Sequence, residues 1–275
     1  MRRYLIPVLL LLSAAVCNAQ TDFQRNYERQ VRNVGYSGVG VETILDGWEA
    51  AEPDNIAMKE GRINYYFNKG QRSEVIVKDT RKYLGAEPLI SVRDSLGRAV
   101  NYFEVTVFDD EQFTLCQKYI DKCIADHPHE LLFRENKIST LMAYEKESPD
   151  LAFSQLSDLV AQYPLETGWT LMGEPETEED FINMVEQYCY AFYLIGTPAG
   201  CRCFRDISSI MLKSHPKNVN FINNIGSYYL VAEDNPKQAV KYYKKALKIE
   251  PDNSAALQNM RIAEKRINAS KAKAK

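Results

Sequence analysis

The chain of 275 residues is poor in the residue types on which most enzymes depend. It contains three histidines, His127, His129 and His215, and two of them, His127 and His215, stand just before a proline. It has no His-Glu-x-x-His, no Gly-x-Ser-x-Gly and no phosphate-binding loop. We therefore expect a non-catalytic protein that uses neither a metal nor another cofactor.

An excess of basic charge is also absent. Lys and Arg number 34 against 37 Asp and Glu, which gives a formal net charge of −3 at pH 7. Because nucleic-acid-binding surfaces are basic, we expect no nucleic-acid partner. The one concentrated basic stretch is the Lys-Ala tail at 269–275, which we interpret as a solvated, fraying terminus.

Long apolar runs are missing except at the start of the chain. After Met1-Arg2-Arg3, the apolar run at 4–16 has about 13 residues, fewer than the roughly 20 that span a bilayer. Small residues around Ala19 predict a signal peptide at 1–19, cut after Ala19, and a periplasmic or secreted protein without a transmembrane segment. Lipoprotein anchoring through Cys17 is the alternative, and Val16 disfavours it because a small residue usually precedes the lipidated cysteine.

The remaining cysteines allow one disulfide. Cys116 and Cys123 lie on one predicted helix at a spacing of about 10 Å, too far apart for a disulfide, so we expect them to replace alanine in packing. Cys189 with Cys201 or Cys203 is the candidate pair in an oxidising compartment. Burial of all three as thiols is the alternative.

The most informative feature that the chain does have is self-similarity. The tetrad Glu52-Pro53-Asp54-Asn55 returns as Glu250-Pro251-Asp252-Asn253, and Pro128, Pro164 and Pro216 end similar runs. Two of the four intervals between successive prolines are 36 and 35 residues, and the other two are 75 and 52. Repeats of about 34 residues are typical of helix pairs that bury their apolar faces on their neighbours.

The segment at 217–251 carries the clearest repeat pattern. Helical spacing gives two apolar faces around the turn Glu233-Asp234-Asn235-Pro236, in which a cap precedes a proline at the first helical position. The small, aromatic and proline positions are Gly226, Tyr229, Ala239, Tyr243, Ala246 and Pro251. In these residues the chain resembles the tetratricopeptide repeat (TPR) family, as a secreted bacterial member. The resemblance implies an all-α fold, a right-handed superhelical TPR-like solenoid of antiparallel helix pairs.

On this resemblance, residues 20–275 form one helical repeat domain. Its expected parts are a degenerate repeat at 22–53, a repeat with an insertion at 54–128, a repeat at 129–164, a repeat with a loop insertion at 165–216, the best-matching repeat at 217–251, a closing helix at 254–268 and the basic tail. The chain departs from the family pattern at Lys59, Arg62, Arg134 and Lys137, which stand where apolar residues are expected.

Two stretches interrupt the period. Within 70–109, β-branched and aromatic residues around Asp94-Ser95-Leu96-Gly97 predict a β-hairpin at about 86–109. The hairpin is either decoration, which we favour, or an edge that accepts another strand. The insertion at 165–180 has an acidic end that suits a helix start. It also contains Trp169, which is either an exposed partner contact or tucked against Tyr188 or its neighbours.

The family resemblance implies a groove, lined by the first helix of each repeat, that holds a peptide or protein. Alignment from each proline places six residues there: Glu60, Asn64, Glu135, Ser139, Asn223 and Ser227. The prediction is thus a protein–protein interaction scaffold of the bacterial periplasm or cell envelope. The alternative is a carbohydrate- or nutrient-binding envelope component built on TPR-like helices, with glycan contacts through Trp169 and the tyrosines.

Overall fold

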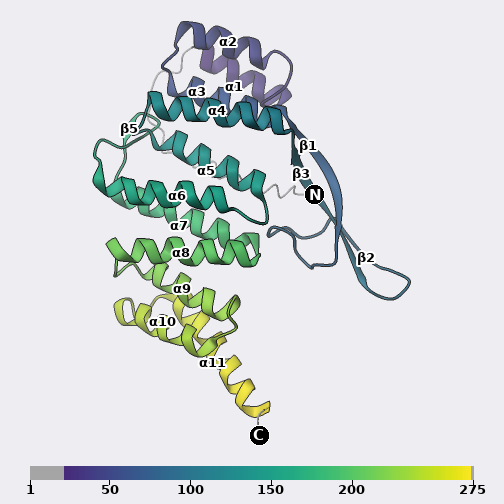
Figure 1. Cartoon of the computed structure of the whole chain (residues 1–275), viewed down its shortest axis with the longest axis vertical. Helices are drawn as coiled ribbons and strands as arrows, with labels where there is room; N and C mark the ends of the chain where they lie inside the picture. Colours follow the sequence, from purple (N-terminus) through teal and green to yellow (C-terminus); the bar gives the residue numbers. More distant parts are fainter. Residues whose placement is uncertain (1–21, 274–275) are drawn as a thin grey trace. The chain divides into compact units, whose positions relative to one another are not determined.

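The chain is mostly helical and carries a small antiparallel sheet. The computed structural model describes residues 22–273, so the expected signal peptide and Cys17 lie outside the described residues. These residues form eleven α-helices, a three-stranded sheet and a short two-stranded hairpin (Figure 1). Among them, no helix combines the length and the apolar character that a membrane crossing requires. The expectation of a helical protein with a β insertion is confirmed.

The helices and strands fall into two compact units. Unit 1 holds the described residues up to Tyr144 together with Glu166–Glu176, and unit 2 holds Glu145–Leu165 and the residues from Thr177 onward. The elements of unit 1 are α1 (Asp22–Val34), α2 (Val41–Ala51), α3 (Ile56–Lys69), β1 (Gln71–Lys78), β2 (Ile90–Arg93), β3 (Ala99–Phe108), α4 (Asp110–Asp126), α5 (Leu131–Glu145, whose last residue belongs to unit 2), β4 (Thr170–Leu171) and β5 (Glu174–Pro175).

Unit 2 consists of helices. Its elements are α6 (Asp150–Gln162), a 3₁₀ turn at Tyr163–Leu165, α7 (Glu178–Ile195), α8 (Pro198–Ser214), α9 (Val219–Val231), α10 (Pro236–Ile249) and α11 (Ser254–Lys273). The closing helix α11 runs past its expected end at 268. The tail is therefore helical as far as Lys273, in keeping with the high helix propensity of Ala and Lys.

The two Glu-Pro-Asp-Asn tetrads build the same turn. Asn55 and Asn253 are positioned to start α3 and α11, and each side chain accepts the backbone N–H three residues later, at 3.0 Å in both copies. Each Asn amide also donates to the carboxylate of its own tetrad, Glu52 at 2.7 Å and Glu250 at 3.0 Å. The repeated sequence is thus a helix stop followed by a helix cap.

The packing of α9 on α10 follows the predicted pattern of small and large residues. A Cβ added to Gly226 would lie 2.6 Å from Cε1 of Tyr243, so no side chain fits at this close approach. Tyr243, Ala239 and Ala246 are fully buried. Such interlocking is how an antiparallel helix pair closes its interface.

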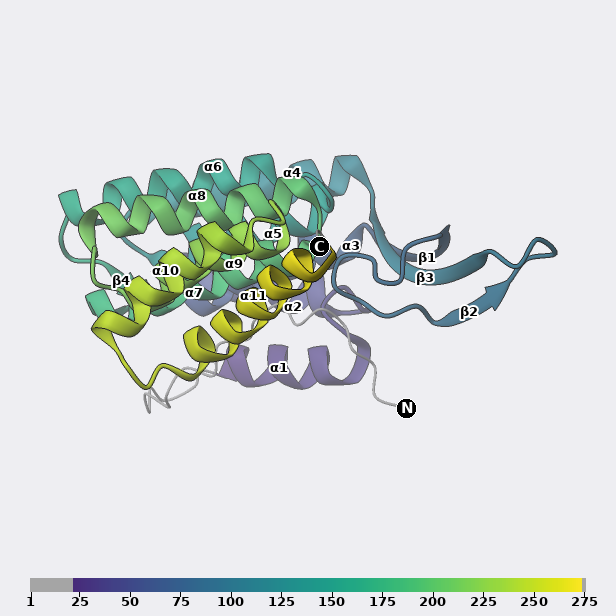
Figure 2. The same cartoon turned by 90° about the horizontal axis from the view of Figure 1, so that it is seen from below.

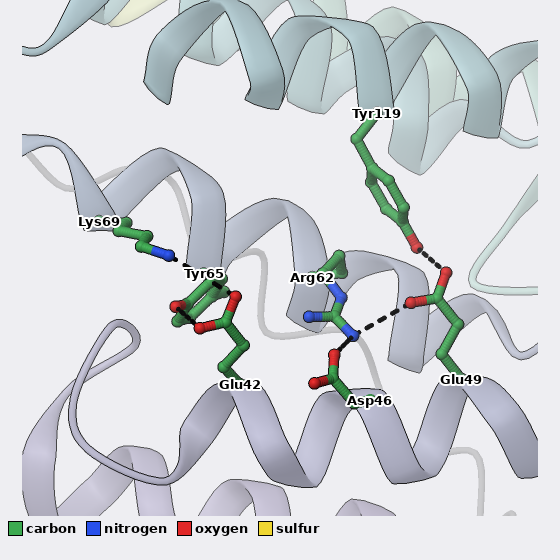
Figure 3. A network of polar contacts seen from close by, with 7 residues as sticks. All are labelled: Glu42, Asp46, Glu49, Arg62, Tyr65, Lys69 and Tyr119. Carbon is green, nitrogen blue, oxygen red and sulfur yellow. Dashed lines mark hydrogen bonds and ion pairs between the residues drawn. The ribbon is translucent and has the colours of Figure 1, made fainter. Parts of the chain in front are cut away.

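In unit 1, charged residues occupy buried positions because acidic partners surround them. Arg62 of α3 is 3% exposed, and its guanidinium contacts Asp46 at 2.7 Å and Glu49 at 3.0 Å, both on α2 (Figure 3). The hydroxyl of Tyr119 donates to Glu49 from α4 at 3.3 Å. An ion-paired arginine therefore takes the place of an apolar residue between α2, α3 and α4.

The same solution recurs at two of the three other departures from the apolar pattern, whereas Arg134 donates to the backbone carbonyl of Pro128 at 3.2 Å. Lys59 is buried and pairs with Asp126 at 3.5 Å. Lys137, which aligns with Arg62, pairs with Asp121 of α4 at 2.8 Å. The aliphatic stems pack while the charged ends are neutralised, so the helical register is kept.

The first insertion forms a sheet with strand order β1-β3-β2, all antiparallel. The predicted hairpin corresponds to β2 and β3, and Asp94 closes its turn by accepting from Leu96 N and Arg98 N at 2.9 Å each. The prediction missed the third strand, β1, with which the sheet begins at Gln71. The first half of β1 is polar, and its second half is the consecutive apolar run Val75-Ile76-Val77. The sequence of β1 therefore lacks the apolar–polar alternation from which a strand is predicted.

Candidate protein-interaction surfaces

One face of the three-stranded sheet is covered by the loop that follows β1. The rings of Tyr83 and Phe103 lie 5.8 Å apart, and Asn101 donates to the carbonyl of Thr80 at 2.8 Å. Lys78 places its ammonium 4.8 Å from the centre of the Tyr83 ring. Phe103 and Asn101 are consequently buried on this side of β3.

The opposite face, which we call the open face, carries the apolar side chains Val75, Val77, Tyr102, Ile90 and Val92, together with Val100 opposite Val92 and Glu104 opposite Val75. The register pairs Val77 with Tyr102 and Tyr102 with Ile90, so these side chains point to one side of the sheet. The exposed fractions are 61% for Val75, 55% for Val77, 60% for Ile90 and 45% for Val92. Four aliphatic side chains on one face are therefore left in water.

The sheet is anchored to the helices of unit 1 at one end. Figures 1 and 2 show its strands running away from the ends of α3 and α4. At the anchored end, Phe108 packs against Phe67, Phe113 and Tyr144 with ring centroids 5.3–5.9 Å apart. The open face lies further along the strands, beyond this anchored end.

Four carboxyl groups form a second polar feature of unit 1. Burial raises the pKa of Glu135 on α5 to about 8, and the carboxylates of Glu176, Glu130 and Glu60 add to the effect. Burial and Glu130 also raise the pKa of Glu60 on α3. Glu60 and Glu135, both predicted to line one groove, therefore do influence each other. A cationic side chain is the ligand that such a cluster would favour.

Glu130 was not singled out by the sequence, yet it fixes the second insertion. Its carboxylate is 3% exposed and accepts from Thr170 Oγ1 at 2.9 Å, Met172 N at 2.8 Å and Gly173 N at 2.9 Å. Met172 and Gly173 both have positive φ, 55° and 81°, which is the two-residue turn typical of a hairpin. The Met172-Gly173 pair between β4 and β5 is the sequence feature from which this hairpin turn could have been predicted.

Trp169 of this insertion is buried, which corrects one of the two sequence interpretations. It is 5% exposed, and its ring packs edge-on against His129 at 5.2 Å. The prediction of an exposed aromatic for a protein or sugar partner is wrong, because Glu130 holds the flanking residues on unit 1. The side chain is buried, as the alternative interpretation expected, and the ring against which it packs is His129, where Tyr188 or its neighbours were expected.

A small cavity of about 280 Å³ adjoins Glu130. Its volume is close to the lower limit for small-molecule sites, and its lining lacks the predominantly hydrophobic and aromatic side chains that such sites usually have. Within residues 22–273, no group of three or more His, Cys, Asp or Glu side chains is arranged to hold a metal ion. The cavity is lined by Ile56, Asp126, His127, Pro128, His129, Glu130 and Thr170.

The other predicted groove residues have local roles in their own units. In unit 1, Asn64 and Ser139 are half-buried, and the Ser139 hydroxyl donates to the carbonyl of Glu135 at 2.8 Å. In unit 2, Ser227 accepts hydrogen bonds from the Tyr243 hydroxyl and the Asn259 amide, both at 3.4 Å. Asn223 Oδ1 is buried without a hydrogen-bond partner among the described residues.

All five described cysteines are buried free thiols, so the candidate disulfide of Cys189 is absent. Cys189 accepts a hydrogen bond from Ser208 at 3.7 Å. Ser208 lies about 8–10 Å further along α8 than Cys203 and Cys201. Cys189, which contacts Ser208, is therefore too far along the helix axis to form a disulfide with either cysteine. Burial raises the pKa of Cys189 to about 12.

Cys116 and Cys123 are fully buried in the core between α3, α4 and α5, as their predicted role in packing requires. Burial raises the pKa of both thiols to about 12. Thiolate chemistry is therefore suppressed at these positions.

Comparison with known proteins supplies no family: no protein-family model and no curated protein matches the chain.

Proposed function

We propose that the protein is a non-catalytic protein–protein interaction scaffold that offers the open face of its sheet to a partner protein. The observation that carries this proposal is the exposure of Val75, Val77, Ile90 and Val92 on one face. Burying apolar surface is worth about 25 cal/mol per Å². Soluble proteins rarely leave a contiguous apolar patch exposed unless another surface covers it.

The helical part of the chain supports the same class of function. The Gly226–Tyr243 approach and the twin tetrads favour TPR-like repeats, and stacked helix pairs of this kind commonly present binding surfaces. This proposal includes a TPR-like solenoid for the helices. It also includes a bacterial origin of the protein and a location in the periplasm or cell envelope.

The acidic cluster of unit 1 is a second contact that we include in the proposal. Burial makes ionisation of Glu135 and Glu60 costly; the pKa of Glu135 rises to about 8 with Glu176, Glu130 and Glu60 adding to the effect, and Glu130 adds to the rise in the pKa of Glu60. A lysine or arginine of a partner would relieve that cost. The segment that docks there is therefore expected to be basic. The burial of Trp169 leaves no observation that favours the carbohydrate-binding alternative.

The open face is tested by changing its chemistry without changing the strand. Ile90→Thr combined with Val92→Thr keeps β-branched side chains and strand propensity but replaces apolar groups with hydroxyls. Val39→Thr is the matched control, since Val39 is 89% exposed and precedes α2, away from the sheet.

Each tagged variant is expressed in the native cells, and co-purified proteins are quantified by mass spectrometry. We expect specific partners of the wild type to be retained by Val39→Thr and depleted about tenfold by the double variant, because a few buried side chains dominate interface energy. Equal recovery of the same partners by all three proteins would refute the proposal.

A further inference from the structure

We propose that helix α10 docks on a membrane surface rich in anionic phospholipids. This inference is independent of the proposed function, because α10 belongs to unit 2 and the open face belongs to unit 1. The occupant is the phosphate layer of the lipid headgroups. The contact is a row of five lysines, which we call the lysine stripe: Lys237, Lys241, Lys244, Lys245 and Lys248.

The first step is that basic residues are concentrated in the last two helices of unit 2. Helices α10 and α11 together contain ten Lys and Arg residues and one acidic residue, Glu264. The chain as a whole has 34 basic and 37 acidic residues. The near-neutral net charge therefore conceals a strongly basic part of the molecule, and such a local potential attracts anionic partners.

The second step is the geometry of α10, which places the five lysines on one side. A helix turns by about 100° per residue, so the five positions fall within an arc of about 100° and along about 16 Å of the axis. All five lysines are exposed. Ala239, Tyr243 and Ala246 occupy the opposite side of the helix and are fully buried. The lysine stripe therefore faces away from the core of unit 2.

The third step is that no internal partner neutralises the stripe. Among the described residues of unit 2, contacts between basic side chains and carboxylates form at Arg205, His215 and Arg266, and none involves a lysine of the stripe. Arg266 also donates to the carbonyl of Leu230 at 2.8 Å, so it helps to hold α11 on α9. The charge of the stripe, by contrast, is available to a partner outside the chain.

Within the isolated chain the stripe is electrostatically unfavourable. Like charges four residues apart destabilise a helix, and the stripe contains three such pairs. Lys237 lies in the first turn of α10, where the helix dipole disfavours a positive charge. Helix α7 instead begins with Glu178, Glu179 and Asp180. Only Lys248 lies in the last turn, where the dipole favours it. An anionic surface would offset this repulsion.

The fourth step is that the stripe is made of lysine alone, which favours a lipid surface among anionic partners. Arginine forms the bidentate contacts that recognise one particular phosphate or carboxylate, in nucleic acids and in acidic peptides. Lysine is a flexible, strongly hydrated point charge, and it responds to the summed potential of many headgroups. Ile249, 39% exposed at the end of α10, adds an apolar contact. We expect reversible, salt-sensitive attachment.

The test is co-sedimentation of the protein, purified from its native cells, with phosphatidylcholine vesicles that contain about one-third phosphatidylglycerol. The wild type should bind these vesicles and should be released by salt, because screening weakens the attraction. Lys241→Glu combined with Lys245→Glu should weaken partitioning at least about tenfold. The matched control is Lys118→Glu combined with Lys122→Glu, which reverses two exposed lysines at the same spacing on α4 and should bind like the wild type.

Circular dichroism verifies that both double variants are folded. Three results would overturn the inference. The first is equal binding of the wild type to anionic vesicles and to pure phosphatidylcholine vesicles, and the second is equal loss of binding in the two double variants. The third is tighter binding to double-stranded DNA of about 20 base pairs than to vesicles at equal phosphate concentration, which would make nucleic acid the occupant. Each result would leave the proposed function intact, because partner binding is tested on β2.

Discussion

At the residue scale, polar side chains in unit 1 take over positions that packing alone would give to apolar residues. Arg62 and Lys59 are nearly inaccessible, yet each meets carboxylates on neighbouring helices. Further along the same pair of helices, the Tyr65 hydroxyl donates to Glu42 at 2.6 Å, and Lys69 pairs with Glu42 at 3.6 Å (Figure 3). Breaking a buried pair leaves an uncompensated charge, so these contacts fix which helices can be neighbours.

Glu135 gives the residue-scale prediction, which concerns pH. Burial and the carboxylates of Glu176, Glu130 and Glu60 raise its folded-state pKa to about 8, whereas in the unfolded chain it titrates near 4.5. The folded protein therefore holds more protons between these values, and its stability falls as pH rises through this window. Because a pKa difference of one corresponds to about 1.4 kcal/mol, Glu135→Gln should flatten that decline by roughly 3 kcal/mol.

Urea unfolding at pH 5 and at pH 8 measures this effect as the difference in free energy of unfolding. The control is Glu111→Gln, which changes an exposed carboxylate at the start of α4 and should keep the wild-type pH dependence. If Glu135→Gln and the wild type lose the same stability between the two pH values, the acidic cluster does not act as described.

At the scale of elements, the second insertion depends on one buried carboxylate. Glu130 accepts from the backbone of the Met172-Gly173 turn, and Trp169 is buried beside it. Glu130→Ala should release the β4–β5 hairpin, because two backbone N–H groups lose their acceptor at a cost of about 1–3 kcal/mol.

Tryptophan fluorescence reports this release directly. Trp48 is fully buried in the core of α1, α2 and α3, so it should not respond. We expect a red-shifted emission component and increased quenching by acrylamide from Trp169 in Glu130→Ala. Unchanged emission with wild-type quenching would show that Glu130 does not hold the hairpin.

Helix positions could be predicted from the sequence because local signals mark them. Asn55, Asn253 and the prolines of the tetrads set the helix ends, and small residues such as Gly226 mark close approaches. These signals depend on residues within one or two turns of each other.

Features that depend on distant residues could not be predicted in the same way. β1 is recognisable only through its pairing with β3, about 30 residues later. The burial of Trp169 depends on Glu130, which binds the neighbouring Thr170. The disulfide is absent because Cys189 contacts α8 at Ser208, away from Cys201 and Cys203. Of the four carboxylates of the acidic cluster, Glu60 and Glu135 hold equivalent repeat positions in the sequence, whereas Glu130 and Glu176 hold none.

At the scale of the whole molecule, the helices of the described chain carry most of the core, and the sheet carries the exposed aliphatic face. The helices of both units bury most of their large apolar residues, although single ones such as Leu151, Tyr190 and Val231 are exposed, whereas the sheet of unit 1 gathers four exposed aliphatic side chains on its open face. Strand β1 adds an unpaired edge. Under the proposed function, the packed helices hold the sheet in place, and the open face is the surface that gains binding energy when a partner covers it.

The central claim is that a partner protein covers the open face, and site-specific photo-crosslinking tests it most directly. A photoreactive amino acid replaces Ile90 in one variant and Val39 in another, and both variants are irradiated in the native cells. Ile90 lies on β2 and is 60% exposed on the open face. We predict a discrete adduct with a different protein from position 90 and none from position 39. No adduct at position 90, or the same adducts from both positions, would contradict the account.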